Sequence, residues 1–189
     1  MELLEAILQR RTKRKFTDKK VPHEFLEKLV DCARYAPAGA NRQPLKYIFL
    51  EEESLVKKIF PYTKWSGYHP EDAPNENEQP TAYIAILGDK NIKPNENFEI
   101  DAGAAGTIIS LVAEDLGLSS CWLGSIDKKE LAKMFNLDDN LVLLYLIALG
   151  YSDQKARAHD AKGDIKYYTD AEGVLNVPKR PMDEILIKL

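Results

Sequence analysis

The sequence predicts one domain in which helices and strands are intermixed, in an α+β or α/β arrangement. Segments with helical periodicity alternate along the chain with short runs of residues that favour β-strands. No internal repeat and no linker divides the 189 residues, a length that suffices for one domain with a substantial core. A content of 44% hydrophobic and 30% charged residues is typical of a folded globular protein.

The first half of the chain predicts three helices and a strand. Apolar residues at helical spacing indicate a first helix that ends near residue 10 and a second within residues 21–37, with Pro22 in its first turn and Pro37 as its stop. The β-rich segment KYIFLE, from Lys46, predicts a strand. A short helix is expected at residues 54–60.

The second half predicts strands at residues 81–89, 119–125 and 141–151. The last of these is apolar without alternation, so it is expected to be buried on both faces. A helix of about five turns starts near Phe98, and Asp127 with Glu130 forms a capping-box pattern that starts another. Two interior glycines in the first of these helices, Gly103 and Gly106, indicate close approach by another helix or a flat ligand, because each costs about 1 kcal/mol relative to alanine.

Two stretches lack a clear pattern. Residues 61–80 are polar with four prolines, and a loop of this length is usually functional or disordered. Residues 151–179 show little periodicity before the apolar end PMDEILIKL. A terminal apolar segment beyond a long irregular arm indicates that the arm, about residues 151–189, lies on another subunit.

Charge is unevenly distributed. The net charge is −4, which argues against a general nucleic-acid binder, yet residues 9–20 hold seven basic residues and one acid. Within them, RRTKR at residues 10–14 follows the first predicted helix. Basic residues at a helix end can be a solvated surface favoured by the helix dipole. A locally basic segment in an acidic protein also suits a small anion.

The remaining signals indicate a cytoplasmic protein without a membrane span. Cys32 and Cys121 lie in apolar patterns and have no partner at metal or redox spacing, so both are expected to be reduced thiols. The N-terminus lacks a signal-peptide pattern, and the apolar run at residues 141–149 is far shorter than the roughly 20 residues that span a bilayer.

Motifs for hydrolysis and metal binding are sparse. The three histidines are scattered, and no HxH, HExxH, CxxC or GxSxG motif occurs. We therefore expect neither a metal site nor a catalytic side chain. A chain without good nucleophiles or ligands, but with small residues and local positive charge, favours chemistry supplied by a cofactor.

Four stretches together resemble the nitroreductase family of FMN-dependent oxidoreductases, in order over nearly the whole chain. They are RRTKRKF (10–16), APAGANRQP (36–44), DAGAAGTIISLVAEDLGLSSCWLGS (101–125) and VPKRPMDEIL (177–186). The resemblance implies an α+β fold: a central, mostly antiparallel sheet flanked by helices, in one domain of residues 1–189. It also implies an intertwined homodimer with two FMN sites at the interface.

The resemblance assigns FMN contacts residue by residue. The FMN phosphate and ribityl chain would be held by two segments of the chain. The first contributes Arg10, Arg11, the hydroxyl of Thr12 and Arg14. The second contributes Lys179 and Arg180. Such charge-assisted hydrogen bonds contribute about 1.5–3 kcal/mol each. Lys13 alternates with these residues and is expected to face solvent.

Further contacts would come from two loops. The partner subunit's loop would offer Pro37, Ala38, Gly39, Asn41 and Gln43 to the flavin, with Ala38 where the family usually has serine. Only backbone contacts then remain at that position. The backbone of Leu123 and Gly124 would lie near flavin N5, where the absence of a Cβ at Gly124 permits close approach.

Substrate contacts are expected from the polar loop. Trp65, Tyr68 and His69 are candidates to line the pocket, with His69 as a proton donor, while Tyr167 and Tyr168 are as easily explained by interface packing. The implied activity is ping-pong reduction of a small nitroaromatic, quinone or similar acceptor by NADH or NADPH. Alternatives are reductive dehalogenation or flavin cleavage, a non-catalytic flavin-binding module, and a nucleic-acid contact through residues 10–20.

Overall fold

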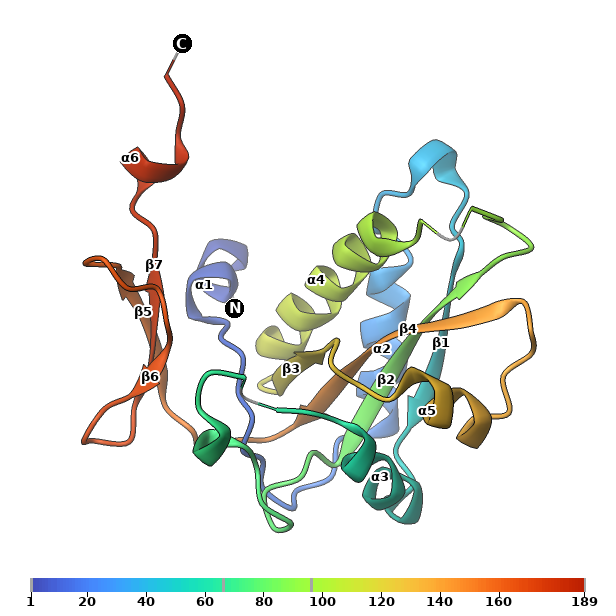
Figure 1. The fold of residues 1–189 in the computed structure, drawn as a ribbon, viewed down its shortest axis with the longest axis horizontal. Coiled ribbons are helices and arrows are strands. Elements are labelled where there is room, and N and C mark those ends of the chain that lie inside the picture. The colour runs from blue at the N-terminus through green and yellow to red at the C-terminus, as the bar shows by residue number, and fades with distance from the viewer. Residues whose placement is uncertain (1, 66, 96, 189) are drawn as a thin grey trace.

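A four-stranded antiparallel sheet forms the centre of the computed structural model, which describes residues 2–65, 67–95 and 97–188 (Figure 1). Its strand order is β1-β2-β4-β3. The strands are β1 (Leu45–Leu50), β2 (Ala82–Asp89), β3 (Ser119–Leu123) and β4 (Leu141–Gly150). Every residue of β2 is buried, because this strand is paired on both sides and covered on both faces. The predicted α+β class is confirmed.

Two layers of helices cover the sheet, and the alternation of side chains along β2 separates them. On one face, α2 (His23–Ala33) and α4 (Glu99–Asp115) share a core with Ile84 and Ile86. On the other face, α3 (Glu53–Ile59) and α5 (Lys128–Met134) share a core with Tyr83 and Leu87. Since both faces are covered, β4 needs an uninterrupted apolar sequence, as predicted.

Local sequence signals hold at the helix ends. Pro22 is the N-cap of α2, and the helix ends before Pro37. The Asp127 carboxylate accepts a hydrogen bond of 3.1 Å from the main-chain N–H of Glu130, which caps α5 as predicted.

The basic segment continues the sheet beyond β3. It follows α1 (Leu3–Gln9), and Thr12 forms a parallel bridge with Ser120. The main-chain N–H of Lys13 donates to the Ser120 carbonyl at 3.2 Å. Phe16 is buried and fills the space beside Gly150, where a Cβ would stand 2.8 Å from its ring. These contacts hold the segment along the edge of the sheet.

The polar loop at residues 61–80 is shaped by two short turns, η2 (Phe60–Tyr62) and η3 (Pro70–Asp72). Its first part is tied to the segment after β3 by a hydrogen bond of 2.9 Å from the Lys64 N–H to the Ser125 carbonyl. Its second part reaches the C-terminal arm, where the Thr169 hydroxyl donates to Asp72 at 3.3 Å.

The C-terminal arm contains a second sheet, in the order β5-β7-β6, so the prediction of an irregular segment was wrong. Its elements are β5 (Ala156–Asp160), β6 (Tyr168–Thr169), β7 (Leu175–Lys179) and the short helix α6 (Met182–Ile185). The strands are short, and ARAHD in β5 contains none of the β-branched residues, phenylalanine, tyrosine or tryptophan that would indicate a strand. Figure 1 shows the arm beside α1, with the chain end projecting away from the body.

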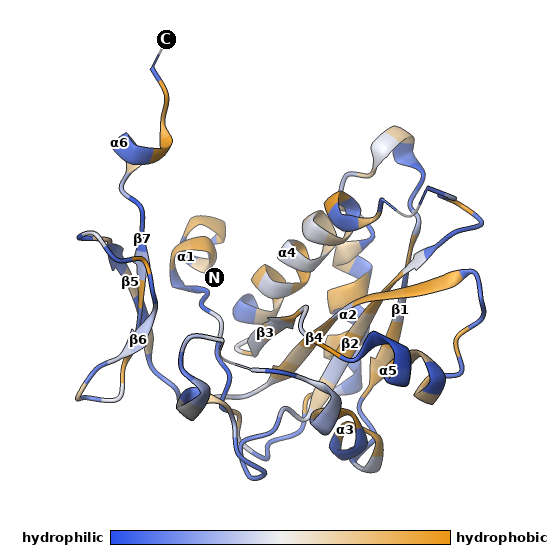
Figure 2. Ribbon diagram, in the orientation of Figure 1, coloured by the Kyte–Doolittle hydropathy of each residue, from blue (hydrophilic) through white to orange (hydrophobic). Residues whose placement is uncertain are grey.

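Apolar residues occur along α1 and the chain end (Figure 2), and several of their side chains are exposed. Leu3, Leu4 and Leu8 are 69%, 67% and 63% exposed, and Ile187 is 86% exposed. The apolar stripe that predicts α1 is therefore not covered within this chain. In the described ranges, no helix has the length and hydropathy needed to cross a bilayer.

Candidate cofactor site

The side chains of the basic segment divide between two directions. Because the chain is extended from residue 11, successive side chains point to opposite sides. Arg11 and Lys13 both line a hollow of about 570 Å³, which they share with Glu114 of α4. Arg14 lies elsewhere, with its guanidinium carbon 4.6 Å from the centroid of the Tyr167 ring. Lys13 and Arg14 thus face different surroundings.

Arg11 has a role within the chain. Its guanidinium donates to the Leu8 carbonyl at 2.7 Å and also to the Arg10 carbonyl. These carbonyls belong to the C-terminal end of α1, where no helical partner is available. Burial, and then the charge of Arg10, lower the pKa of Arg11, which remains charged. Its Nε atom has no hydrogen-bond partner among the described residues.

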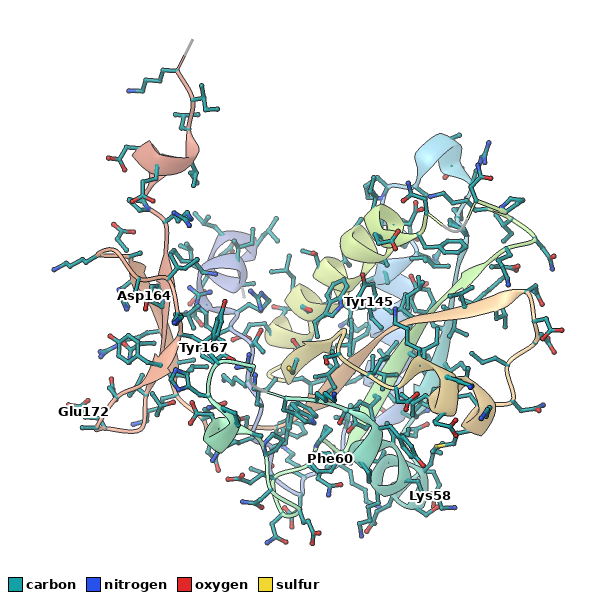
Figure 3. All side chains as sticks on the ribbon, in the orientation of Figure 1. Lys58, Phe60, Tyr145, Asp164, Tyr167 and Glu172 are labelled. Carbon is teal, nitrogen blue, oxygen red and sulfur yellow. The ribbon has the colours of Figure 1, made fainter. Side chains whose placement is uncertain are left out.

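Tyr167 joins Arg14 to the polar loop. The ring centroid of Tyr167 lies 5.3 Å from that of Tyr68 and 5.9 Å from that of His69. Figure 3 shows Tyr167 between the arm and the body. Two of the three predicted pocket residues thus contact the same tyrosine ring as the predicted phosphate ligand Arg14. Tyr167 links them, a residue for which the sequence left pocket lining and interface packing equally open.

Trp65, the third predicted pocket residue, lies apart from this group. Its indole N–H donates to the Thr63 hydroxyl at 2.8 Å. Its ring packs edge-on against Phe16, with centroids 6.4 Å apart, and tilted against Phe60 at 6.0 Å. Trp65 therefore packs on the core beneath α3.

The loop after α2 has an unusual backbone. Ala40, Asn41 and Gln43 have positive φ angles of 50°, 53° and 50°, a region that non-glycine residues rarely adopt. The loop contains the short turn η1 (Gly39–Asn41), and the Gln43 side-chain amide donates a hydrogen bond of 3.1 Å to the Asn41 carbonyl. Such strain persists where the surroundings hold it, and it is concentrated at ligand sites.

The two predicted halves of the flavin site lie at opposite ends of α4. Pro37, Ala38 and Gln43 line a hollow of about 160 Å³ with Asp101, in the first turn of that helix. Arg11 meets Glu114, near the other end. At 1.5 Å per residue, Asp101 and Glu114 are about 20 Å apart along the helix axis. One chain does not bring the basic segment and the loop together.

Three glycines, Gly103 and Gly106 of α4 and Gly124 just after β3, have different surroundings. A Cβ on Gly106 of α4 would overlap the Trp122 ring of β3, so an intrachain contact accounts for that glycine. A Cβ on Gly124 would meet Tyr145 at 3.4 Å, an ordinary contact, so packing within the chain does not require glycine there. A Cβ on Gly103 would meet no atom within 4 Å. The side chain of Leu123 is buried in the core, so only the main chain of this residue could contact a ligand.

The remaining predicted residues lie on the arm. Lys179 ends β7 and is exposed, and the Arg180 guanidinium pairs with Glu184 at 3.2 Å. The described residues contain no group of three or more His, Cys, Asp or Glu side chains arranged to hold a metal ion.

Comparison with known proteins identifies the family. A model of the nitroreductase family matches residues 7–151. The chain belongs to the nitroreductase family. A provisionally named NADH dehydrogenase/NAD(P)H nitroreductase of Methanothermobacter thermautotrophicus is 28% identical over 165 residues, covering 85% of this chain and 82% of the relative. The FMN reductase [NAD(P)H] of Bacillus subtilis is 23% identical over 173 residues, covering 82% and 68%.

Solved structures agree with this assignment. A provisionally named nitroreductase of Desulfovibrio desulfuricans, in complex with FMN, has a TM-score of 0.74 and 25% identity, covering 100% of this chain and 97% of that chain. A provisionally named NADH oxidase of Clostridium acetobutylicum has a TM-score of 0.66 and 33% identity, covering 78% and 87%. At the level of the family, the prediction of an FMN-dependent oxidoreductase is confirmed.

Proposed function

We propose that this nitroreductase-family protein reduces nitroaromatic, quinone or similar electron-poor small molecules with NADH or NADPH, through FMN, in a ping-pong cycle. The observation that carries the proposal is the extended basic segment beside β3, where the Tyr167 ring contacts Arg14 of this segment and also Tyr68 and His69 of the polar loop. The names of the Methanothermobacter and Bacillus relatives support this reaction class.

The residues present suit the phosphate of FMN. A phosphomonoester carries nearly two negative charges and is well bound by a guanidinium together with a hydroxyl donor. Alternation along the extended segment assigns Thr12 and Arg14 to one side, and Arg10 adds a half-buried cation next to them. Because the Arg11 guanidinium is used by carbonyls of α1, we assign Arg11 to shaping the segment and adding charge. Lys179 and Arg180 remain proposed contacts.

The flavin ring would lie near Gly124. Packing inside the chain does not explain a glycine at this position, whereas close approach of a flat ring to the backbone does. The main-chain N–H groups of this segment would donate to the ring edge. The partner subunit would supply Pro37, Ala38 and Gly39 against the ring, with Asn41 and Gln43 as amide donors.

A homodimer is part of the proposal. The separation of the two half-sites along α4 supports a site completed by a second copy of the chain. The exposed apolar side chains of α1 and the chain end supply surface for such a contact, and Ile100 of α4 is 78% exposed next to the open Gly103 position. Small residues on α4 would let two helices cross closely.

FMN held by these residues would supply the redox chemistry that links oxidation of NAD(P)H to reduction of the acceptor. The residues of the chain would bind the cofactor and orient the substrate. Tyr68 and His69 would cover the substrate, and His69 would donate a proton to it or leave that task to solvent. No side chain need act as a nucleophile.

A titration and a turnover assay test the proposal. Purified protein should bind FMN more tightly than riboflavin, because the basic segment binds the phosphate. The FMN complex should oxidise NADH or NADPH with a quinone or nitroaromatic acceptor. Flavin binding without turnover would favour a non-catalytic binding module. Turnover only with a halogenated aromatic would favour reductive dehalogenation, and turnover only with flavin itself would favour flavin cleavage.

A further inference from the structure

A second hollow, of about 760 Å³, lies on the C-terminal arm (here the arm hollow). One face of the arm sheet forms its floor, through Arg157 and His159 of β5 and Tyr168 of β6. The segment between β5 and β6 forms its wall, with Lys162, Asp164 and Lys166. Figure 3 marks Asp164 and Tyr167 on this part of the arm. The volume falls within the range of about 300–1,000 Å³ that is typical of small-molecule sites.

The charge of the arm hollow favours an anion. Arg157, Lys162 and Lys166 contribute three cations, against the single carboxylate of Asp164. Arg157 is already held by Asp170 at 3.0 Å and by Asn176 at 2.7 Å. In the described part of the chain, neither Lys162 nor Lys166 has a carboxylate within ion-pair distance. Two ammonium groups therefore remain to bind a ligand.

The aromatic side chains of the arm hollow favour a flat ring. His159 and Tyr168 meet edge-on with centroids 6.3 Å apart, and Tyr168 is 43% exposed. An aromatic face beside lysines is a combination that binds nucleotides, since the base stacks and the phosphate pairs with the cations. The mixed chemistry therefore fits a phosphorylated nucleoside better than a simple anion.

The arm hollow adjoins the proposed cofactor site. Tyr167 and His69 line it, and the Tyr167 ring also contacts the Arg14 guanidinium. None of the residues Arg10, Thr12 and Arg14 lines it. A ligand that reaches from the flavin site into this hollow would be long, and the lysines and aromatic rings of the hollow fit an anionic nucleoside at its far end.

We propose that the arm hollow binds the adenosine 2′-phosphate end of NADPH, which makes NADPH the preferred reductant. This proposal rests on the proposed function for the identity of the reductant. Lys162 and Lys166 pair with the 2′-phosphate, a group that NADH lacks. Tyr168 stacks on the adenine ring, which both dinucleotides carry.

The test compares three reductants on two variants of the FMN-loaded protein. The double variant Lys162→Gln/Lys166→Gln should raise KM for NADPH about tenfold, the effect of losing one to two exposed charge-assisted contacts. Its KM for NADH and for reduced nicotinamide mononucleotide should stay unchanged, as should kcat and FMN affinity. Tyr168→Ala should raise KM for NADPH and NADH alike, and leave that of the mononucleotide unchanged.

A matched control removes the same charge elsewhere. Lys58→Gln/Lys129→Gln changes two exposed lysines, one on α3 and one on α5. Both helices lie across the molecule from the arm (Figure 1). This control should leave all three KM values unchanged. The proposal is overturned if the arm variant behaves like the control, if it raises KM for NADH as much as for NADPH, or if it loosens FMN instead.

A binding measurement separates this proposal from the proposed function. Calorimetric titration of the wild-type protein with adenosine 2′,5′-bisphosphate needs no turnover. Binding that is lost in Lys162→Gln/Lys166→Gln supports the arm hollow even if the protein turns out to reduce no acceptor. Absence of binding to a protein that oxidises NADPH overturns the arm hollow and leaves the reductase activity standing.

Discussion

The guanidinium of Arg14 lies 4.6 Å from the centre of the Tyr167 ring, a distance typical of a cation–π contact. The two residues belong to different parts of the fold, the edge of the central sheet and the C-terminal arm. The Tyr167 ring also contacts Tyr68 and His69 of the polar loop. A single tyrosine thus connects the proposed phosphate site with the loop that we expect to cover the substrate.

Arg14→Ala should weaken FMN binding about ten- to hundred-fold, the equivalent of 1.5–3 kcal/mol for one charge-assisted hydrogen bond to phosphate. Lys13→Ala is the matched control, because it removes the neighbouring charge on the other side of the extended segment. Titration of flavin fluorescence measures both. Equal losses of FMN affinity in the two variants would mean that the segment attracts the phosphate through its overall positive charge and that Arg14 makes no specific contact.

Tyr167→Leu should weaken FMN binding about three- to tenfold, because Arg14 loses the ring that orients it. Tyr167→Phe keeps the ring and should bind FMN like the wild type. A double-mutant cycle separates this role from a general structural one. If Tyr167→Leu causes the same loss in the Arg14→Ala background, Tyr167 does not act through Arg14.

The two thiols should react differently. Burial raises the pKa of Cys121 to about 12, so this thiol stays protonated and unreactive at pH 8, whereas Cys32 is only partly buried. We expect the native protein to release one equivalent of thionitrobenzoate from Ellman's reagent, and a second after denaturation. Cys32→Ser should remove the native reaction. Rapid reaction of both thiols in the native protein would contradict the buried position of Cys121.

The free energy of unfolding should decrease at alkaline pH. Burial raises the pKa of Cys121 from 9.0 to about 12 and that of Tyr47 from 10.0 to about 12. Between about pH 9 and 12 the unfolded chain therefore binds fewer protons than the folded chain, and stability falls as pH rises. Urea titrations at pH 8 and 10 measure the change. Cys121→Ala should reduce the difference between the two.

Deletion of residues 182–189 should weaken the dimer and FMN binding together while most secondary structure is retained. The reason is that the apolar chain end is exposed in one chain and each flavin site is proposed to need both subunits. Sedimentation and flavin titration on the truncated protein measure the two effects. A truncated monomer that holds FMN at full affinity would show that one chain forms the whole site.

Local patterns in the sequence determined most of the secondary structure. The apolar run of β4, the Asp127 cap of α5 and the ends of α2 each depend on residues a few positions apart, whose periodicity and hydrogen bonding are set by the chain itself. The position of the basic segment after α1 was readable for the same reason. Recognition of the family rested on four such local stretches in a fixed order.

Contacts between distant residues were decided only by the tertiary structure. The packing of the arm brings Tyr167 to Arg14, and the end of α1 takes up the Arg11 guanidinium that the sequence assigned to phosphate. The length of α4 separates the two proposed half-sites. The β5–β7–β6 sheet is held by Arg157, Asp170 and Asn176, polar residues that carry no strand pattern. Such pairs form because the packing of the folded chain places them together, and the positions of the two residues in the sequence do not indicate the contact.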